Sequence, residues 1–312
     1  MIRKKLLIAW AISANARNLY SFIEFDNKPM QVTLSQFAGF CDGVRRAYEI
    51  VTSLAGKEIK RPVFVLGSLV HNQDVVERIE KLGIKKISIE DFRQSKKGEI
   101  GTIIVTAHGV GPWFYDKARA DGIDVVDTTC CKVIKVQRLA RYFIRKGGAV
   151  VLVGDKDHKE VEGIDEWGEG KTLIVSSESD LDGIKIDPLK RLTILSQTTQ
   201  NRTLVKKIYD RLKKKYPHLE MIDTICSTTY DRQKEVERLA KTNEIVLVIG
   251  SPESANSTRL FEIAKKFNPN SHFIENAGGL APEWFRGKET VGVTAGASSP
   301  NWVIEDVIAK IS

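Results

Sequence analysis

The feature that most constrains this chain is a threefold internal repeat marked by cysteines. Each of three cysteines follows a short apolar segment and precedes a stretch with apolar residues at helical spacing, which ends on Gly or Asn. A continuous apolar segment then ends on a glycine 26, 24 and 24 residues after the cysteine, and a polar loop follows 67, 68 and 72 residues after it. The cysteines are Cys41, Cys130 and Cys226, the glycines are Gly67, Gly154 and Gly250, and the loop positions are His108, Thr198 and Ser298.

This repeat predicts an α/β fold. Continuous apolar strands that alternate with helices indicate parallel sheets covered on both faces. We therefore predict three pseudo-repeated units, each a small doubly wound parallel sheet, arranged like a trefoil around a central cluster site. The predicted division is an N-terminal extension over 1–30 and α/β units over 31–120, 121–218 and 219–312. Ligands of such sheets bind at the carboxyl ends of the strands, where the polar loops of the repeat also lie.

Three equivalent cysteines at predicted helix N-termini indicate a metal centre. The helix dipole and the free N–H groups favour the thiolate, which is the form that binds metals. Three thiolates could hold zinc with a histidine as fourth ligand, or a [4Fe–4S] cluster with one iron left free. Cys131 is out of register with the repeat, so Cys130 is the predicted ligand and Cys131 opens the helix. Four cysteines without a C-x-x-C pair make a poor disulfide framework for a chain of 312 residues.

The polar loops of the repeat carry a second set of candidate residues. Three of the five histidines fall in these loops, which predicts a cationic site for phosphate, and the third unit offers neutral donors instead. Glu160 is the one carboxylate there with an obvious acid–base role. Thr198 either relays a proton or caps the following helix. The histidines are His71, His108 and His158, and the neutral donors are Ser254, Asn256 and Ser298.

Charge and the N-terminus bear on partners and location. The net charge of +8 suggests an anionic partner, or simply a solvated lysine-rich surface; no nucleic-acid motif accompanies it, so we expect no nucleic-acid partner.

The first residues, "MIRKKLLIAWAISANAR", resemble a short secretory signal, but an upstream extension before a start at Met30 is the favoured interpretation. No stretch approaches the roughly 20 apolar residues of a membrane span. We therefore expect no membrane partner and a cytoplasmic protein.

Between Gln31 and Ile311 the chain resembles the 4-hydroxy-3-methylbut-2-enyl diphosphate reductase family, which catalyses the last step of the non-mevalonate isoprenoid pathway. The resemblance rests on "GFCDGVRRA", "LVHNQDVV", "AHGV", "DTTC", "HKEVEG", "SQTTQN", "DTIC…RQ", "NSTRL" and "VTAGASSP". Several of these motifs are weak signals alone, but together they are highly specific. The resemblance implies three α/β units around an oxygen-sensitive [4Fe–4S] cluster, held by the cysteines matching Cys41, Cys130 and Cys226.

The resemblance also implies roles for the loop residues. The substrate hydroxyl binds the open iron, and the carboxylate matching Glu160, assisted by the group matching Thr198, delivers protons. Ferredoxin or flavodoxin supplies two electrons singly, water leaves, and the products are isopentenyl diphosphate and dimethylallyl diphosphate. His158 is counted with the catalytic residues as well as with the diphosphate ligands. The groups that hold the diphosphate match His71, His108, His158, Thr198, Ser254, Asn256 and Ser298.

The chain departs from the motifs of the family at four positions. Cys131 and Lys159 stand where the family usually has proline, Ser227 where larger residues are common, and Ala255 where many members have serine. None of these changes removes a predicted cluster ligand or Glu160. Three alternatives stay open at this point: an iron–sulfur hydro-lyase, a non-catalytic iron–sulfur sensor, and a zinc enzyme.

Overall fold

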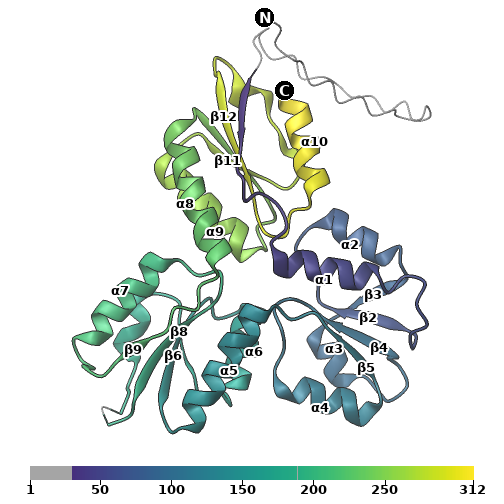
Figure 1. Ribbon diagram of the computed structural model, residues 1–312, viewed down its shortest axis with the longest axis vertical. Helices are drawn as coiled ribbons and strands as arrows, with labels where there is room; N and C mark the ends of the chain where they lie inside the picture. Colours follow the sequence, from purple (N-terminus) through teal and green to yellow (C-terminus); the bar gives the residue numbers. More distant parts are fainter. Residues whose placement is uncertain (1–29, 188) are drawn as a thin grey trace, which may run out of the picture.

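The computed structural model describes residues 30–187 and 189–312, and it contains three separate sheets. Figure 1 shows them as three lobes around a common centre. Each sheet has four strands, and every strand pair is parallel. The predicted α/β class, with three small parallel sheets in a trefoil-like arrangement, is confirmed.

The first sheet has the strand order β3-β2-β4-β5 and a hydrophobic core on each face. Alternate residues of β4 point to opposite faces, so Ile104 packs with α1 and α2, whereas Ile103 packs with α3 and α4. The elements are α1 (Asp42–Thr52), β2 (Val63–Leu66), α2 (Gln73–Glu80), β3 (Ile84–Ile87), α3 (Ile89–Gln94), β4 (Thr102–Val105), α4 (Pro112–Asp121) and β5 (Asp124–Asp127).

The second sheet repeats this design in the order β7-β6-β8-β9. Leu152 and Leu195 pack under α5 and α6, while Val151 and Ile194 pack under α7 and a short 3-10 turn, η1. The elements are α5 (Cys131–Arg145), β6 (Ala149–Val153), α6 (Lys159–Trp167), β7 (Leu173–Val175), η1 (Glu178–Gly183), β8 (Leu192–Ser196), α7 (Arg202–Lys213) and β9 (Glu220–Met221).

The third sheet has the order β1-β12-β10-β11 and joins the two ends of the described chain. Val246 and Val248 pack with α8 and α9, and Leu247 packs on the opposite face with α10. The elements are β1 (Gln31–Leu34), α8 (Ser227–Thr242), β10 (Ile245–Ile249), α9 (Ala255–Phe267), β11 (Ser271–Ile274), η2 (Ala277–Gly279), η3 (Pro282–Phe285), β12 (Thr290–Ala295) and α10 (Asn301–Ile311).

The sheets and the sequence repeat are out of step by one strand. The strand before each cysteine pairs with the strand that ends another repeat. β5 pairs with β4, β9 pairs with β8, and β1 pairs with β12 from the last repeat. The predicted boundaries at 120/121 and 218/219 assign these strands to the following unit, so the hydrogen-bonded sheets cross them. That division stays an interpretation of the repeat. The chain passes from one sheet to the next at each cysteine, which places the three cysteines between lobes.

The N-terminal extension lies outside the described residues over 1–29, and so does the choice between a signal-like segment and an upstream extension. Within residues 30–187 and 189–312, no helix is both long enough and apolar enough to cross a membrane.

Candidate active site

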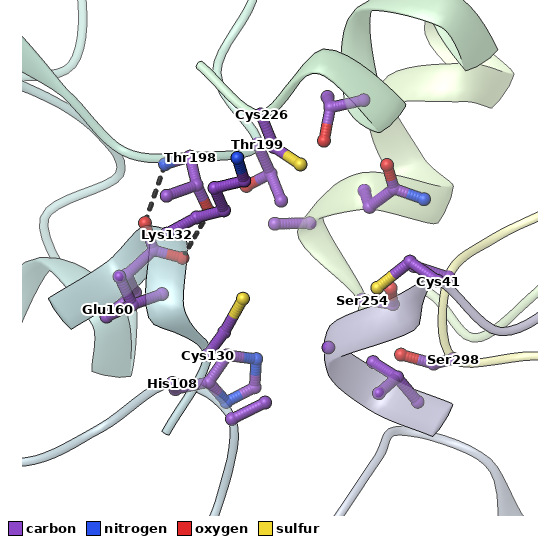
Figure 2. A pocket seen from close by; sticks show the side chains of 18 of the residues that line it. Cys41, His108, Cys130, Lys132, Glu160, Thr198, Thr199, Cys226, Ser254 and Ser298 are labelled. Atoms are coloured by element: carbon purple, nitrogen blue, oxygen red, sulfur yellow. Dashed lines mark hydrogen bonds between the residues drawn. The ribbon is translucent and has the colours of Figure 1, made fainter. Parts of the chain in front are cut away.

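One cavity collects every site residue that the sequence predicts. Its walls come from all three lobes and are built at the carboxyl ends of strands and the first turns of helices, where the parallel-sheet argument places a ligand. Figure 2 shows the three cysteines on separate walls, with Glu160 and Thr198 on one side. The predicted residues in the lining are Cys41, His71, His108, Cys130, His158, Glu160, Thr198, Cys226, Ser254, Asn256 and Ser298.

The three cysteines are the N-cap residues of α1, α5 and α8, as the repeat predicts. Each has an extended backbone before the first helical turn, so its side chain stands beside the free N–H groups of that turn. At Cys130 burial raises the pKa of the thiol, while the backbone N–H groups of Lys132 and Val133 lower it. Burial prevails there over the helix N-terminus, so a bound metal would have to displace the thiol proton.

The neighbouring cysteines have different surroundings. Cys130 is half-buried and lines the cavity, whereas Cys131 is exposed and is the first residue of α5. The structure therefore puts Cys130 beside the other two lining cysteines, in agreement with the register of the repeat.

The space between the thiols is open at Gly43. A Cβ atom on Gly43 would lie 2.8 Å from Cys130 Sγ and 3.9 Å from Cys41 Sγ, so the absent side chain leaves open the region that both sulfurs border. Among the residues that the structure describes, no group of three His, Cys, Asp or Glu side chains converges closely enough for one metal ion. Three thiols that border one open cavity are a donor set that fits an iron–sulfur cluster.

Glu160 is a buried carboxyl group held by one residue. It is 2% exposed; Thr198 N donates to Oε1 at 2.6 Å and Thr198 Oγ1 donates to Oε2 at 2.9 Å. Burial raises the pKa of Glu160 to about 7, although both hydrogen bonds from Thr198 lower it. Thr198 does not cap α7, whose N-cap is Asn201, so its hydroxyl serves Glu160 instead. The carboxyl group is therefore poised to carry a proton near neutral pH.

The three histidines form a row along the cavity wall. The ring centroids of His71 and His108 are 5.9 Å apart, and those of His108 and His158 are 5.2 Å apart. Burial, together with the nearby His158 and His71, lowers the pKa of His108 to about 3. Burial likewise lowers the pKa of His158 to about 4. His158 Nδ1 accepts from Glu160 N at 3.1 Å, so the neutral ring carries its proton on Nε2.

The third lobe contributes neutral donors. Ser254 is the N-cap of α9, and its Oγ accepts from Ser257 N at 3.4 Å. Asn256 is 6% exposed, and its Nδ2 is buried without a hydrogen-bond partner among the described residues. An unsatisfied buried amide in a cavity wall is costly unless a ligand accepts from it. Ser298 completes this side of the cavity after β12, and Ala255 lines it without adding a side-chain donor.

A family model described as LytB protein matches residues 32–312. The chain belongs to the LytB family. A LytB relative, the 4-hydroxy-3-methylbut-2-enyl diphosphate reductase of Geobacter metallireducens, is 39% identical over 284 residues, which cover 90% of this chain and 97% of the relative. The reductase of the same name from Aquifex aeolicus is 36% identical over 286 residues, covering 90% and 96%.

Two solved structures are similar to this one. The E-1-hydroxy-2-methyl-but-2-enyl-4-diphosphate reductase of Plasmodium falciparum superposes with a TM-score of 0.83 at 28% identity, covering 90% of this chain and 87% of that one. A structure titled (E)-4-hydroxy-3-methyl-but-2-enyl diphosphate reductase, the terminal enzyme of the non-mevalonate pathway, gives a TM-score of 0.65 at 36% identity, covering 90% and 99%.

The LytB cavity also contains residues that the sequence reasoning missed. The second and third residues after each cysteine all line it, which the register of the repeat could have revealed. Arg232, one turn further along α8, had no such signal because a buried arginine cannot be told from a surface one by sequence. The missed lining residues are Gly43, Val44, Ala107, Lys132, Val133, Thr199, Thr228, Thr229, Arg232 and Ala297.

Proposed function

We propose that this chain reduces (E)-4-hydroxy-3-methylbut-2-enyl diphosphate to isopentenyl diphosphate and dimethylallyl diphosphate, the last step of the non-mevalonate isoprenoid pathway. The reaction consumes two electrons and two protons, breaks the allylic C–O bond and releases water. The observation that carries the proposal is a single cavity that combines three thiols, a buried acid and a row of phosphate-type donors. Family membership and the names of the relatives support the same reaction.

Cys41, Cys130 and Cys226 are the residues that would hold a [4Fe–4S] cluster. When bound, such a cluster supplies electrons one at a time and a Lewis-acidic iron that has no protein ligand. The open space beside Gly43 and the spread of the thiols over three lobes support this assignment. Because each thiol comes from a different lobe, cluster binding would also tie the lobes together.

The donor row would hold the diphosphate. Histidine N–H groups and the Ser and Asn donors can each contribute a hydrogen bond to a phosphate oxygen, and a bound diphosphate would raise the pKa of His108 and His158 and strengthen their bonds. The buried Asn256 amide, which lacks a partner among the described residues, favours a ligand acceptor at this position. Fixing the diphosphate orients the small apolar part of the substrate toward the thiols.

Glu160 would deliver the proton that accompanies C–O bond cleavage. Hydroxide is a poor leaving group, so a protonated acid near it lowers the barrier. With a pKa of about 7, Glu160 keeps a substantial protonated fraction at neutral pH. Thr198 donates to both carboxyl oxygens of Glu160 and therefore fixes the orientation of the acid. His158 accepts a hydrogen bond from the backbone N–H of Glu160.

We further propose ferredoxin or flavodoxin as the electron donor and the cytoplasm as the location. Electrons must arrive singly from a low-potential carrier for a cluster of this type to be reduced. The four cysteines are all free, which suits a reducing compartment.

An anaerobic assay after iron–sulfide reconstitution tests the proposal. Reduced viologen would supply electrons, and its oxidation would be followed with and without the hydroxymethylbutenyl diphosphate. We expect substrate-dependent oxidation that yields both five-carbon diphosphates. Turnover that needs no reductant would instead identify a hydro-lyase, and a fully loaded cluster with no turnover of any kind would favour a sensor.

A further inference from the structure

Arg232 is an arginine buried beneath the cavity. It lies on α8, two turns after Cys226, and is 2% exposed. Its Nη1 donates to Ala295 O at 2.8 Å and its Nη2 donates to Gly39 O at 2.6 Å. Gly39 precedes Cys41, and Ala295 ends β12 just before the loop of Ser298, so one guanidinium group joins α8 to two other walls of the site.

The same guanidinium group lies close to two of the three thiols. Arg232 lines the cavity together with Cys41 and Cys226. Burial lowers the pKa of Arg232, and the neighbouring Cys41 and Cys226 thiols, followed by Glu235 and Asp42, raise it. Because the ordinary pKa of a guanidinium group lies far above 7, the side chain stays charged in this position.

One nitrogen atom of Arg232 lacks a hydrogen-bond partner among the described residues. Its Nε is buried and has no hydrogen-bond partner among the described residues, although both terminal nitrogens are satisfied. A buried N–H without an acceptor is unfavourable, which points to an acceptor that the described residues do not supply. Sulfur atoms of a bound cluster are acceptors of this kind, since hydrogen bonds to cluster sulfurs are common and tune the potential.

A second residue of α8 holds the segment that carries Cys41. Glu235, one turn after Arg232, accepts from Ser35 Oγ, from Gln36 N at 3.3 Å and from Phe37 N at 3.4 Å. Glu235 therefore holds the start of the segment 35–41 to α8 by hydrogen bonds, and Arg232 holds the segment near its end through the carbonyl group of Gly39. Removing the Arg232 guanidinium group would therefore leave the start of this segment attached through Glu235.

We propose that Arg232 is a positioning residue whose fixed positive charge, on the Cys41–Cys226 side of the site, makes a bound iron–sulfur cluster easier to reduce. The proposal rests on the proposed function, because it takes the three cysteines as cluster ligands. A reduced cluster carries one more negative charge than an oxidised one, so a buried cation beside it stabilises the reduced form. Low dielectric around the buried group strengthens this effect relative to a surface charge.

The experiment compares three variants of the reconstituted protein. Arg232→Gln removes the charge, Arg232→Lys keeps it, and Lys241→Gln removes a positive charge from the same helix at a side chain that is 53% exposed. Iron and sulfide content would be measured first, and then the midpoint potential by titration followed with electron paramagnetic resonance. We expect a shift to more negative potential in Arg232→Gln, and potentials close to the parent in Arg232→Lys and Lys241→Gln.

The outcomes separate the proposal from a purely structural role and from the proposed function. A full cluster with an unchanged potential in Arg232→Gln would overturn the proposal. If Arg232→Gln holds too little iron to titrate, Arg232→Lys becomes the deciding variant. A full cluster at near-parent potential in Arg232→Lys would support a role for the positive charge. Loss of the cluster in Arg232→Lys as well would mean that the site needs the shape of arginine and would overturn the proposal. A potential shift in a protein without reductase turnover would uphold this inference while refuting the proposed reaction.

Discussion

Thr198 holds both carboxyl oxygens of Glu160, one through its backbone N–H at 2.6 Å and the other through its hydroxyl at 2.9 Å. Two hydrogen-bond donors aimed at a carboxylate lower its pKa. At Glu160 the effect of burial is larger, and the pKa is raised to about 7. The pair therefore fixes a proton carrier in one orientation. Glu160 belongs to α6 and Thr198 follows β8, so the two elements of the second lobe set this geometry together.

Glu160→Gln should abolish most turnover while leaving the cluster in place. Glutamine has nearly the same shape but cannot release a proton, so the loss should be about 10²- to 10⁴-fold in kcat, the usual contribution of a general acid. The assay is reductant oxidation in the reconstituted variant, with iron content measured beside it. Glu162→Gln is the matched control, because Glu162 is an exposed glutamate on the same helix. Near-parent turnover in Glu160→Gln would remove Glu160 from the mechanism.

Glu160 should contribute less to the stability of the cluster-free protein as pH rises from about 4.5 to about 7. Its pKa is raised in the folded state, so the folded protein binds the proton more tightly than the unfolded chain does. This contribution is fully present below pH 4.5 and is lost as pH rises through about 7. It should amount to about 3 kcal/mol. Urea unfolding of the parent and of Glu160→Gln checks this: the difference in unfolding free energy should move in favour of the variant from pH 5 to pH 8, and a constant difference would contradict it.

Diphosphate binding should draw protons into the site. The pKa of His108 lies at about 3 and that of His158 at about 4, so both rings are neutral at pH 7 before an anion binds. A bound diphosphate raises both pKa values, and binding should strengthen as pH falls. Calorimetry with inorganic diphosphate in buffers of different ionisation enthalpy measures the uptake. His108→Asn should take up fewer protons and bind about 10- to 100-fold more weakly. Tight binding without proton uptake would mean that the histidines act as neutral donors.

Cys130→Ser should lose the cluster, and Cys131→Ser should keep it. Cys130 is half-buried in the cavity wall, whereas Cys131 is exposed at the start of α5. The two variants are matched controls for each other, because they make the same chemical change at neighbouring positions. Iron and acid-labile sulfide after anaerobic reconstitution are the measurement. Cluster loss in the Cys131 variant with retention in the Cys130 variant would reverse the assignment.

Much of this architecture was predictable because the sequence repeats. Equivalent spacings after Cys41, Cys130 and Cys226 indicated three parallel sheets, and the loops that follow strands in such sheets share one edge. The carboxylate at Glu160 and the histidines followed from their places in those loops. All of them line one cavity.

Other features depend on long-range contacts that local pattern does not encode. The pairing of β5 with β4 was not predicted. The repeat groups β5 with the cysteine that follows it, and the sequence does not show which sheet a short edge strand joins. The role of Arg232 was hidden for a similar reason: its acceptors are the carbonyl groups of Gly39 and Ala295, 193 and 63 residues away. The repeat places Gly43 near Cys41, but it does not show that the Cys130 thiol from another lobe borders the space beside Gly43.

Gly43→Ala should impair cluster binding without unfolding the protein. The added Cβ would lie 2.8 Å from Cys130 Sγ, closer than such atoms approach, so the thiol would have to turn away from the space that it shares with Cys41. Gly43 lies in the first turn of α1, where alanine is favoured over glycine by up to about 1 kcal/mol, so the fold itself should be as stable as before. Gly183→Ala is the control, because a Cβ there meets nothing within 4 Å. The measurement pairs the iron content with the urea midpoint of the cluster-free protein. We expect low iron and an unchanged or raised midpoint for Gly43→Ala, and parent values for the control; a full iron content in Gly43→Ala would show that the cluster does not need this space.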